Sequence, residues 1–221
     1  GSDIPHDPAL SLRQNFRQWI LPEVFNSAVS SINQTSKGKE WLSKKQLQDL
    51  HDQILRQPNR TLLEANEAIH KLLFKAQVDI NEVTSEQDPV VKLIDFASPE
   101  NNTFHAINQF RIDTPGCVKQ FIIPDIVLFV NGIPLIVVEC KKGGPNCANP
   151  MSEAFEQLQR YMNQRKATQQ QGLKEGEPRL FHTSMILIRS CGLEADYGTF
   201  TSGIEHFFPW KTQWPNDDSV A

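Results

Sequence analysis

The chain has 221 residues, of which 39% are hydrophobic and 22% charged, and this composition is enough to bury one core of ordinary size. No segment reaches the roughly 20 uncharged apolar residues of a membrane span and no secretory signal begins the chain, so we expect a cytoplasmic protein without a membrane partner. The net charge of −4 argues against a protein that holds a long stretch of DNA by itself, because such binding depends on Lys and Arg contacts to phosphates.

The first third of the chain has the apolar spacing of amphipathic helices. Apolar residues recur every three or four positions over about residues 12–25 and 42–55. Ser43 is the expected N-cap of the second helix, and Pro58 should stop it because proline lacks a backbone donor. We therefore expect residues 1–58 to form an N-terminal helical extension.

A third helix and then a change to strand patterning follow. The spacing of Thr61 and Glu64 is that of a capping box, which predicts a helix over 61–75. Beyond Asp88-Pro89, segments rich in β-branched and aromatic residues are separated by turn formers. This pattern predicts strands over 90–96, 103–112, 122–130 and 134–140. Asn131-Gly132 between the last two is a strong signal for a hairpin turn.

The remaining elements complete a mixed α/β chain. A helix is predicted over about 150–165, where Phe155 and Leu158 share one face. Residues 169–178 are rich in Gln, Gly and Glu and should form a mobile loop, whereas the apolar segment 184–189 is typical of a buried strand. Helices followed by strands, a helix and a further strand indicate a layered α/β fold.

Three charged residues are predicted to meet at the open end of the hairpin. Asp125 begins one strand, and Glu139 and Lys141 end the next. Side chains alternate along a strand, so Glu139 and Lys141 share a face and Cys140 should point the other way, into the core. Charges that follow the apolar run 135–138 are unfavourable unless they have a ligand, and a hard divalent cation that bridges carboxylate oxygens would supply one.

The register of the hairpin decides whether the two carboxylates meet. A two-residue turn at Asn131-Gly132 would set Asp125 opposite Val138, which leaves Asp125 and Glu139 on opposite faces. A three-residue connection would set Asp125 directly opposite Glu139. We therefore predict a longer loop or a bulge over residues 131–134.

Pro124-Asp125 together with Glu139-Cys140-Lys141 resembles the PD-(D/E)xK nuclease signature, and residues 125–139 are similar to the N-terminal domain of type I restriction enzyme R subunits. Further segments with similar residues are 66–73, 91–96, 99–102, 108–110 and Gln157-x-x-x-Tyr161. The resemblance covers about residues 60–210. It implies a restriction-endonuclease-like fold, in which a mixed central sheet is flanked by helices. The nuclease domain would span 59–200, and 201–221 would be a junction toward a C-terminal motor domain.

The resemblance implies a Mg²⁺-dependent endonuclease that cuts double-stranded DNA. Asp125 and Glu139 would be metal ligands, with the carbonyl of Cys140 as a further ligand. Lys141 would orient or deprotonate the attacking water and stabilise the charge of the transition state. Mn²⁺ is expected to substitute for Mg²⁺, and one or two ions are equally compatible with the sequence.

Four further residues are candidates for the site. Gln157 and Tyr161 are four positions apart and project from one helical face, and in the similar family this pair helps DNA contact and site organisation. Arg160 either contacts DNA phosphates or lies on a solvated helix face. Glu64 is the candidate for a helix-borne carboxylate near the metal. The alternatives to Glu64 are Glu67 and His70.

The resemblance also implies partners. The chain lacks a Gly-x-x-x-x-Gly-Lys-Ser/Thr loop, so we expect no ATP site in it. In the similar family, ATP-driven motor domains lie C-terminal to this segment and translocate DNA before it is cut, and methyltransferase and specificity subunits complete the enzyme. Two alternatives are a free-standing RecB-like or repair nuclease and a catalytically silent PD-(D/E)xK-like domain that serves as a DNA-binding or assembly platform. The intact Asp, Glu and Lys argue against the silent domain.

Overall fold

The computed structural model describes residues 4–58, 60–145, 147–192 and 194–210 and has the mixed α/β architecture expected from the sequence. The α-helices are α1 (Pro22–Ile32), α2 (Lys44–Leu55), α3 (Leu62–Lys75), α4 (Pro150–Tyr161) and α5 (Lys166–Gln169). The 3-10 helices are η1 (Pro8–Ser11), η2 (Pro99–Asn101), η3 (Pro178–Phe181) and η4 (Ile204–His206). Among the described residues, no helix is both long and apolar enough to span a membrane.

A six-stranded mixed sheet forms the centre of the fold, in the order β10-β9-β8-β7-β6-β3. Its strands are β3 (Phe104–Asn108), β6 (Ile126–Val130), β7 (Ile133–Cys140), β8 (Ile186–Ser190), β9 (Ala195–Gly198) and β10 (Phe208–Pro209). Strands β7 and β8 are parallel, and the other neighbours are antiparallel. Two small ribbons pair β1 (Ala76–Gln77) with β2 (Val90–Val91) and β4 (Ile112–Asp113) with β5 (Phe121–Ile122).

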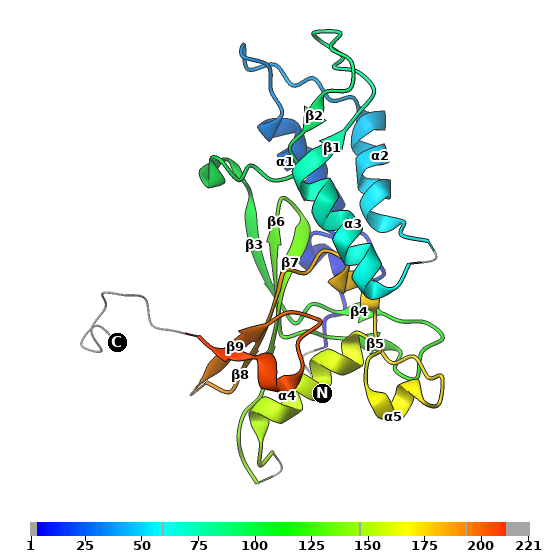
Figure 1. Cartoon of the computed structure of the whole chain (residues 1–221), viewed down its shortest axis with the longest axis vertical. Helices are drawn as coiled ribbons and strands as arrows, with labels where there is room; N and C mark the ends of the chain where they lie inside the picture. The colour runs from blue at the N-terminus through cyan, green and yellow to red at the C-terminus, as the bar shows by residue number, and fades with distance from the viewer. Residues whose placement is uncertain (1–3, 59, 146, 193, 211–221) are drawn as a thin grey trace, which may run out of the picture.

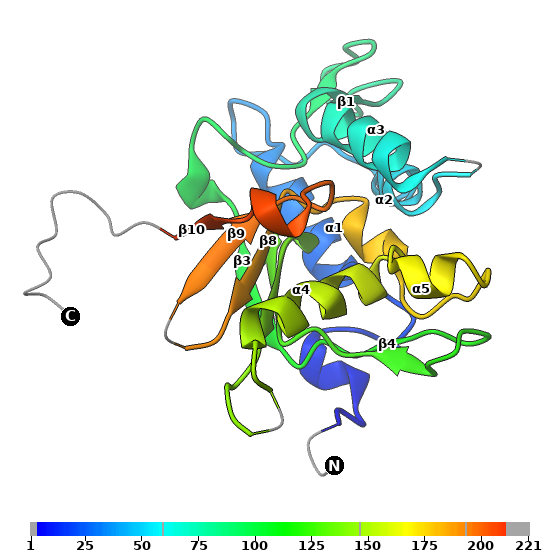
Figure 2. The same cartoon turned by 60° about the horizontal axis from the view of Figure 1, so that its bottom comes forward.

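The two faces of the sheet differ in burial. Helix α4 packs against β7 and β8, as Figures 1 and 2 show. Side chains on that face are fully buried: Val127, Phe129, Val137, Glu139 and Leu187. Side chains that alternate with them on the opposite face are only half-buried: Ile126, Leu128, Ile136, Val138, Ile186 and Ile188. A carboxylate at position 139 therefore points toward α4 and away from solvent.

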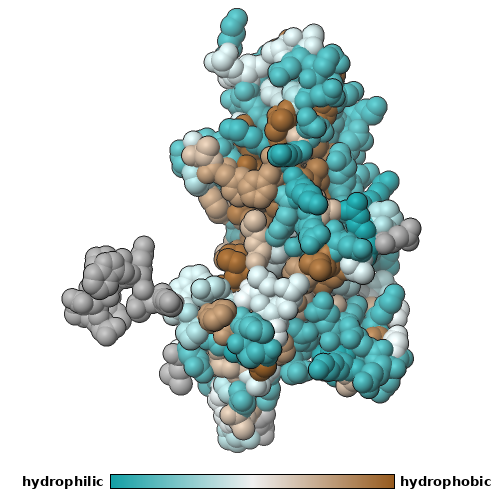
Figure 3. All heavy atoms as spheres, viewed as in Figure 1, coloured by the Kyte–Doolittle hydropathy of each residue, from teal (hydrophilic) through white to brown (hydrophobic). Residues whose placement is uncertain are grey.

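Helices α1, α2 and α3 gather at the end of the molecule where β6 turns into β7 (Figure 1). One cluster of buried side chains joins these helices to the sheet and to α4; its members include Trp19, Phe25, Leu50, Leu73, Val137 and Leu158. On the outside, apolar side chains gather between α3 and β3 (Figure 3). The exposed rings of Phe74, on α3, and Phe96 stack with centroids 4.6 Å apart. The boundary expected at residue 58 stays a prediction, and residues 211–221 of the expected junction lie outside the described residues.

The β6–β7 hairpin has both a two-residue turn and a shift of register. The Cα partners on either side of the shift are Val130 with Ile133 and Ile126 with Val138. Leu135 is the extra residue between them, so the bulge predicted over 131–134 exists but lies one residue further along β7. Continued by one position, the register sets Asp125 opposite Glu139, as the sequence argument required.

The turn itself is buried and held from several sides. Asn131 is fully buried with φ 50°, and its side-chain amide donates to the carbonyl of Leu93 at 2.9 Å. Gly132 has φ 77°, and its carbonyl accepts a hydrogen bond from the N–H of Leu21 at 2.9 Å. The first turn of α1 lies so close that a Cβ at Gly132 would be 2.6 Å from the Leu21 carbonyl oxygen. Packing against α1 therefore fixes the closed end of the hairpin.

The helix caps predicted from the sequence are confirmed. Ser43 and Thr61 each form a complete capping box, with Gln46 and Glu64 as the reciprocal partners. Helix α2 ends at Leu55, before Pro58, as expected.

The helix predicted over 12–25 is wrong. Leu12 takes φ 58°, and α1 begins only at Pro22, whose missing N–H suits the first helical position. The intervening irregular segment is held by Arg13, which is 4% exposed, donates to the carbonyl of Gln18 at 2.7 Å and lies 3.8 Å from the ring centroid of Phe110. Phe16, Trp19 and Ile20 are thus buried without a helix, and only the end of the predicted range, from Pro22, is helical.

Several other predicted boundaries need correction. The strand expected over 90–96 ends at Val91, because the following residues enter a loop in which buried Asp95 accepts a hydrogen bond from Asn101 at 3.2 Å. The strand expected over 103–112 breaks at Gln109, which has φ 49°. Helix α4 stops at Tyr161, short of the expected residue 165. Strands β9 and β10 were not predicted.

The close approach at Gly132 gives a test of the hairpin. We expect Gly132→Ala to lower the free energy of unfolding by on the order of 3 kcal/mol or more, because the methyl group would meet backbone atoms of α1. Gly116→Ala is the matched control, since Gly116 has φ 84° but a Cβ there meets nothing within 4 Å. The control should lose only about 1 kcal/mol. Urea denaturation measures both, and equal losses would contradict the packing described.

Candidate active site

The carboxylate of Asp125 is held at the open end of the hairpin by two donors. Its Oδ2 accepts a hydrogen bond from the backbone N–H of Cys140 at 2.7 Å, and its Oδ1 accepts one from the side-chain amide of Gln109 at 3.0 Å. The donors come from the end of β7 and from the residue after β3, so the carboxylate lies where three strands meet. Each oxygen keeps a further lone pair for another ligand.

Glu139 is the most constrained group of the site. It is 0% exposed, its Oε1 is paired with the ammonium of Lys141, and its Oε2 has no hydrogen-bond partner among the described residues. Burial raises the pKa of Glu139 to about 7 and the negative charge of Asp125 raises it further, whereas the Lys141 ammonium and the nearby Tyr161 hydroxyl lower it. Because that hydroxyl donates its proton to the carbonyl of Ile123, one oxygen of the buried carboxylate is left without a hydrogen-bond donor among the described residues.

The burial predicted for the end of β7 is wrong in one respect. Side chains alternate as expected, but Cys140 is exposed and Glu139 is buried. The reason is that α4 packs on the face on which Glu139 lies, whereas the side chains on the opposite face of β7 and β8 are only half-buried or exposed near this edge. Lys141 follows on the side of Glu139 and is half-buried.

Gln157 and Tyr161 lie on α4 and connect to the strand segment before Asp125. The Gln157 amide donates to the Tyr161 hydroxyl at 2.6 Å, and that hydroxyl donates its single proton to the carbonyl of Ile123 at 2.9 Å. Tyr161 is fully buried, and its pKa is raised by burial and by the negative charge of Glu139. A fully buried side chain has no surface with which to contact DNA.

Arg160 is half-buried on α4, and its guanidinium lies 5.2 Å from the ring centroid of Tyr161. The cation therefore lies on the same helix as the Gln157–Tyr161 pair, and part of its side chain reaches solvent. This placement is compatible with both interpretations of the sequence, a phosphate contact and a solvated helix face.

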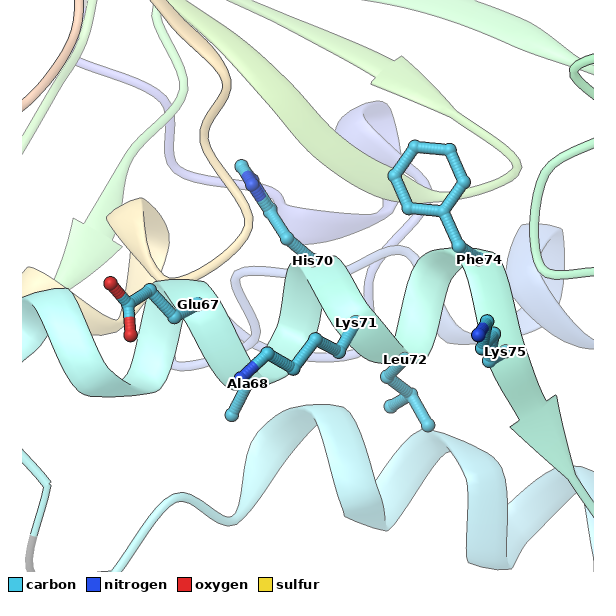
Figure 4. A pocket seen from close by; sticks show the side chains of 7 residues that line it. All are labelled: Glu67, Ala68, His70, Lys71, Leu72, Phe74 and Lys75. Atoms are coloured by element: carbon cyan, nitrogen blue, oxygen red, sulfur yellow. The ribbon is translucent and has the colours of Figure 1, made fainter.

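The structure does not bring Glu64 together with Asp125 and Glu139. Glu64 is exposed in the capping box of α3, and α3 packs against η3 and β1. The alternatives, Glu67 and His70, line a pocket formed along α3 itself (Figure 4). Across the described ranges, no three His, Cys, Asp or Glu residues come close enough to hold a metal ion.

Two carboxylates and a backbone carbonyl still suit a hard cation. Mg²⁺ commonly takes one or two protein carboxylates and completes its shell with water and substrate phosphate oxygens. The unpaired Oε2 of Glu139 and the open lone pairs of Asp125 are oxygen ligands of the required kind. The residues present therefore fit a divalent cation without a third carboxylate.

Sequence reasoning assigned no role to Gln109. It falls in the segment 108–110 that prompted the resemblance, but only the structure places its amide on Asp125. One signal was available in the sequence. Gln109 is a polar residue directly after β3, and β3 pairs with β6, the strand that follows Asp125.

Comparison with known proteins identifies the family of the chain. The model of the family described as type I restriction enzyme R protein N terminus matches residues 3–206. The chain is 30% identical over 201 residues to the type I restriction enzyme HindI endonuclease subunit of Haemophilus influenzae, covering 90% of this chain and 16% of that protein. It is 28% identical over 219 residues to a provisionally named type I restriction enzyme MjaIXP endonuclease subunit of Methanocaldococcus jannaschii, covering 99% of this chain and 19% of that protein. The chain thus spans about a fifth of the length of these relatives.

The raised pKa of Glu139 predicts how stability depends on pH when divalent cations are chelated. The folded state holds a proton up to about pH 7 that the unfolded state releases near 4.5. The contribution of Glu139 to the free energy of unfolding is therefore fully present below pH 4.5 and is lost as the pH rises through 7. Between pH 4.5 and 7 the free energy of unfolding should fall by about 1.4 kcal/mol per pH unit. Glu139→Gln should lose this dependence. Urea denaturation from pH 4.5 to 8 measures it, and parallel curves for the two proteins would contradict the burial of the carboxylate.

Proposed function

The chain belongs to the family of type I restriction enzyme R protein N-termini, and from this membership we propose that it is the endonuclease part of such a subunit, hydrolysing DNA phosphodiester bonds with Mg²⁺. The observation that carries the proposal is the pair of carboxylates, one of them buried with an unpaired oxygen beside an ammonium group. Most buried polar atoms have a hydrogen-bond partner, so an unpaired carboxylate oxygen beside the ion pair supports a further ligand at this position.

Asp125 and Glu139 would hold the cation, with the carbonyl of Cys140 as a further oxygen. When bound, Mg²⁺ would neutralise charge on the phosphoryl oxygens. It would also lower the pKa of a water molecule bound to it toward neutrality. The cation would also relieve the repulsion between the two carboxylates that raises the pKa of Glu139. Mn²⁺ has the same preference for oxygen ligands and should replace Mg²⁺.

Lys141 is the cationic side chain beside the two carboxylates. One of its three N–H groups donates a hydrogen bond to Oε1 of Glu139, and this bond fixes the position of Nζ beside the carboxylates. The two remaining protons are free to orient the attacking water or to contact a phosphoryl oxygen. The ion pair with Glu139 thus keeps the ammonium charge where negative charge develops.

The Gln157–Tyr161 pair would act on the site through the backbone. The Tyr161 hydroxyl holds the carbonyl of Ile123, two residues before Asp125, and Gln157 fixes that hydroxyl. This assigns the pair to site organisation and leaves DNA contact to Arg160, whose guanidinium is better suited to phosphate. Double-stranded DNA, the motor domains of a full-length subunit, and methyltransferase and specificity subunits would be the partners.

The first test replaces the carboxylates in a full-length subunit. Asp125→Asn and Glu139→Gln should each lower DNA cleavage by on the order of 10³-fold while ATP hydrolysis continues, because only the nuclease site is altered. Lys141→Ala should have the same effect. Glu82→Gln, in an exposed loop, is the control and should cut at the wild-type rate. Cleavage at that rate by Asp125→Asn would reject the assignment.

The second test concerns the 221-residue chain alone. We expect it to cut plasmid DNA poorly with Mg²⁺ or Mn²⁺ at low salt, because a net charge of −4 provides few phosphate contacts and DNA must be delivered by attached or associated parts. The comparison is a reconstituted complex with ATP. Efficient cleavage by the chain alone, without ATP, would favour a free-standing nuclease.

A further inference from the structure

Gln109 stands directly after β3 in a backbone conformation that glutamine rarely adopts. Its φ is 49°, in the left-handed region that favours glycine, and its side chain is half-buried. Glycine at this position would avoid the strain. A strained non-glycine residue beside a candidate site indicates that its side chain has a use there.

The left-handed turn at Gln109 is tied to the segment that contains Asp125. The backbone N–H of Gln109 donates to the carbonyl of Asp125 at 2.8 Å, and the N–H of Phe110 donates to the carbonyl of Pro124 at 2.9 Å. These two bonds continue the β3–β6 ladder past the ends of both strands. They place the backbone of Gln109 beside Asp125, from where its side chain reaches the carboxylate.

The side-chain amide completes the contact. Its Nε2 donates to Oδ1 of Asp125 at 3.0 Å, while the N–H of Cys140 holds Oδ2 at 2.7 Å. We propose that Gln109 is a positioning residue that fixes the Asp125 carboxylate for cation binding. This inference rests on the proposed function, since it takes Asp125 as a ligand of the cation.

An amide suits this role better than a charged donor. Lys or Arg at position 109 would pair with the carboxylate and compete with the cation for its charge. The neutral amide restricts rotation of the carboxylate and leaves its full negative charge and one lone pair on each oxygen. Partners of this kind orient metal-binding carboxylates, and their removal commonly weakens metal binding about 10- to 100-fold.

The test separates positioning from folding by two substitutions in the 221-residue chain. Gln109→Met keeps the size of the side chain but removes its donor, whereas Gln109→Gly removes the side chain and relieves the left-handed strain. Gln48→Met is the matched control, because the Gln48 amide donates to Oδ1 of Asp52 at 2.9 Å on the exposed surface of α2. Calorimetric titration with Mn²⁺ gives the affinity, and a thermal melt in chelator gives the melting temperature.

We expect both Gln109 variants to bind Mn²⁺ about 10- to 100-fold more weakly than the wild type and the Gln48 control. Gln109→Gly should bind Mn²⁺ more weakly without a fall in melting temperature. A merely structural role for Gln109 would not produce this combination. When Asp125→Asn is already present, Gln109→Met should cause no further loss of affinity, because the effect acts through that carboxylate.

Wild-type Mn²⁺ affinity in both Gln109 variants, with affinity lost in Asp125→Asn, would overturn the inference and leave the proposed function standing. The inference would also be overturned if both variants lost Mn²⁺ affinity and also melted at a lower temperature, because the loss would then reflect a less stable fold. Mn²⁺ binding that does not depend on Asp125 would overturn the inference and the proposed metal site together.

Discussion

Leu135 has no partner in the β6–β7 ladder, and the side chains of the candidate site take their positions from that one-residue shift. Without it, a two-residue turn would set Asp125 opposite Val138, and the two carboxylates would lie on opposite faces of the sheet. The turn cannot slip to absorb the extra residue, because Gly132 is packed against α1. The shift is therefore confined to the strand, and the N-terminal helices contribute to the geometry of a site at the other end of the hairpin.

Burial by α4 then gives Glu139 its chemistry. A carboxylate with no exposed surface, one ammonium partner and a second carboxylate nearby is unfavourable when ionised, and the raised pKa expresses this. A divalent cation would supply the missing charge and the missing partner for Oε2. The same helix brings Tyr161 to the carbonyl of Ile123, so one element both excludes water from Glu139 and fixes the backbone before Asp125.

The sequence predicted those features that local chemistry determines. The N-cap at Ser43, the capping box at Thr61, the turn at Asn131-Gly132 and the need for a bulge depend on neighbouring residues and were confirmed.

Features that depend on packing were missed or misplaced. The segment before Pro22 is irregular because Arg13 is buried within it, the bulge lies at Leu135 because α1 holds the turn, and Cys140 is exposed because α4 covers the other face. The contact of Gln109 with Asp125 joins different strands, so spacing along the chain did not indicate it. Spacing did indicate that Glu64 caps α3, and this role leaves Glu64 on the surface and not beside Asp125 and Glu139.

The register of one hairpin would thus place two carboxylates around a divalent cation. Anomalous diffraction from crystals of this chain soaked in Mn²⁺ is the decisive measurement. We predict an anomalous peak between Asp125 and Glu139, with Oε2 of Glu139 among the ligands of the ion. Mn²⁺ bound only at other sites, with Oε2 of Glu139 still unpaired at saturating Mn²⁺, would contradict it.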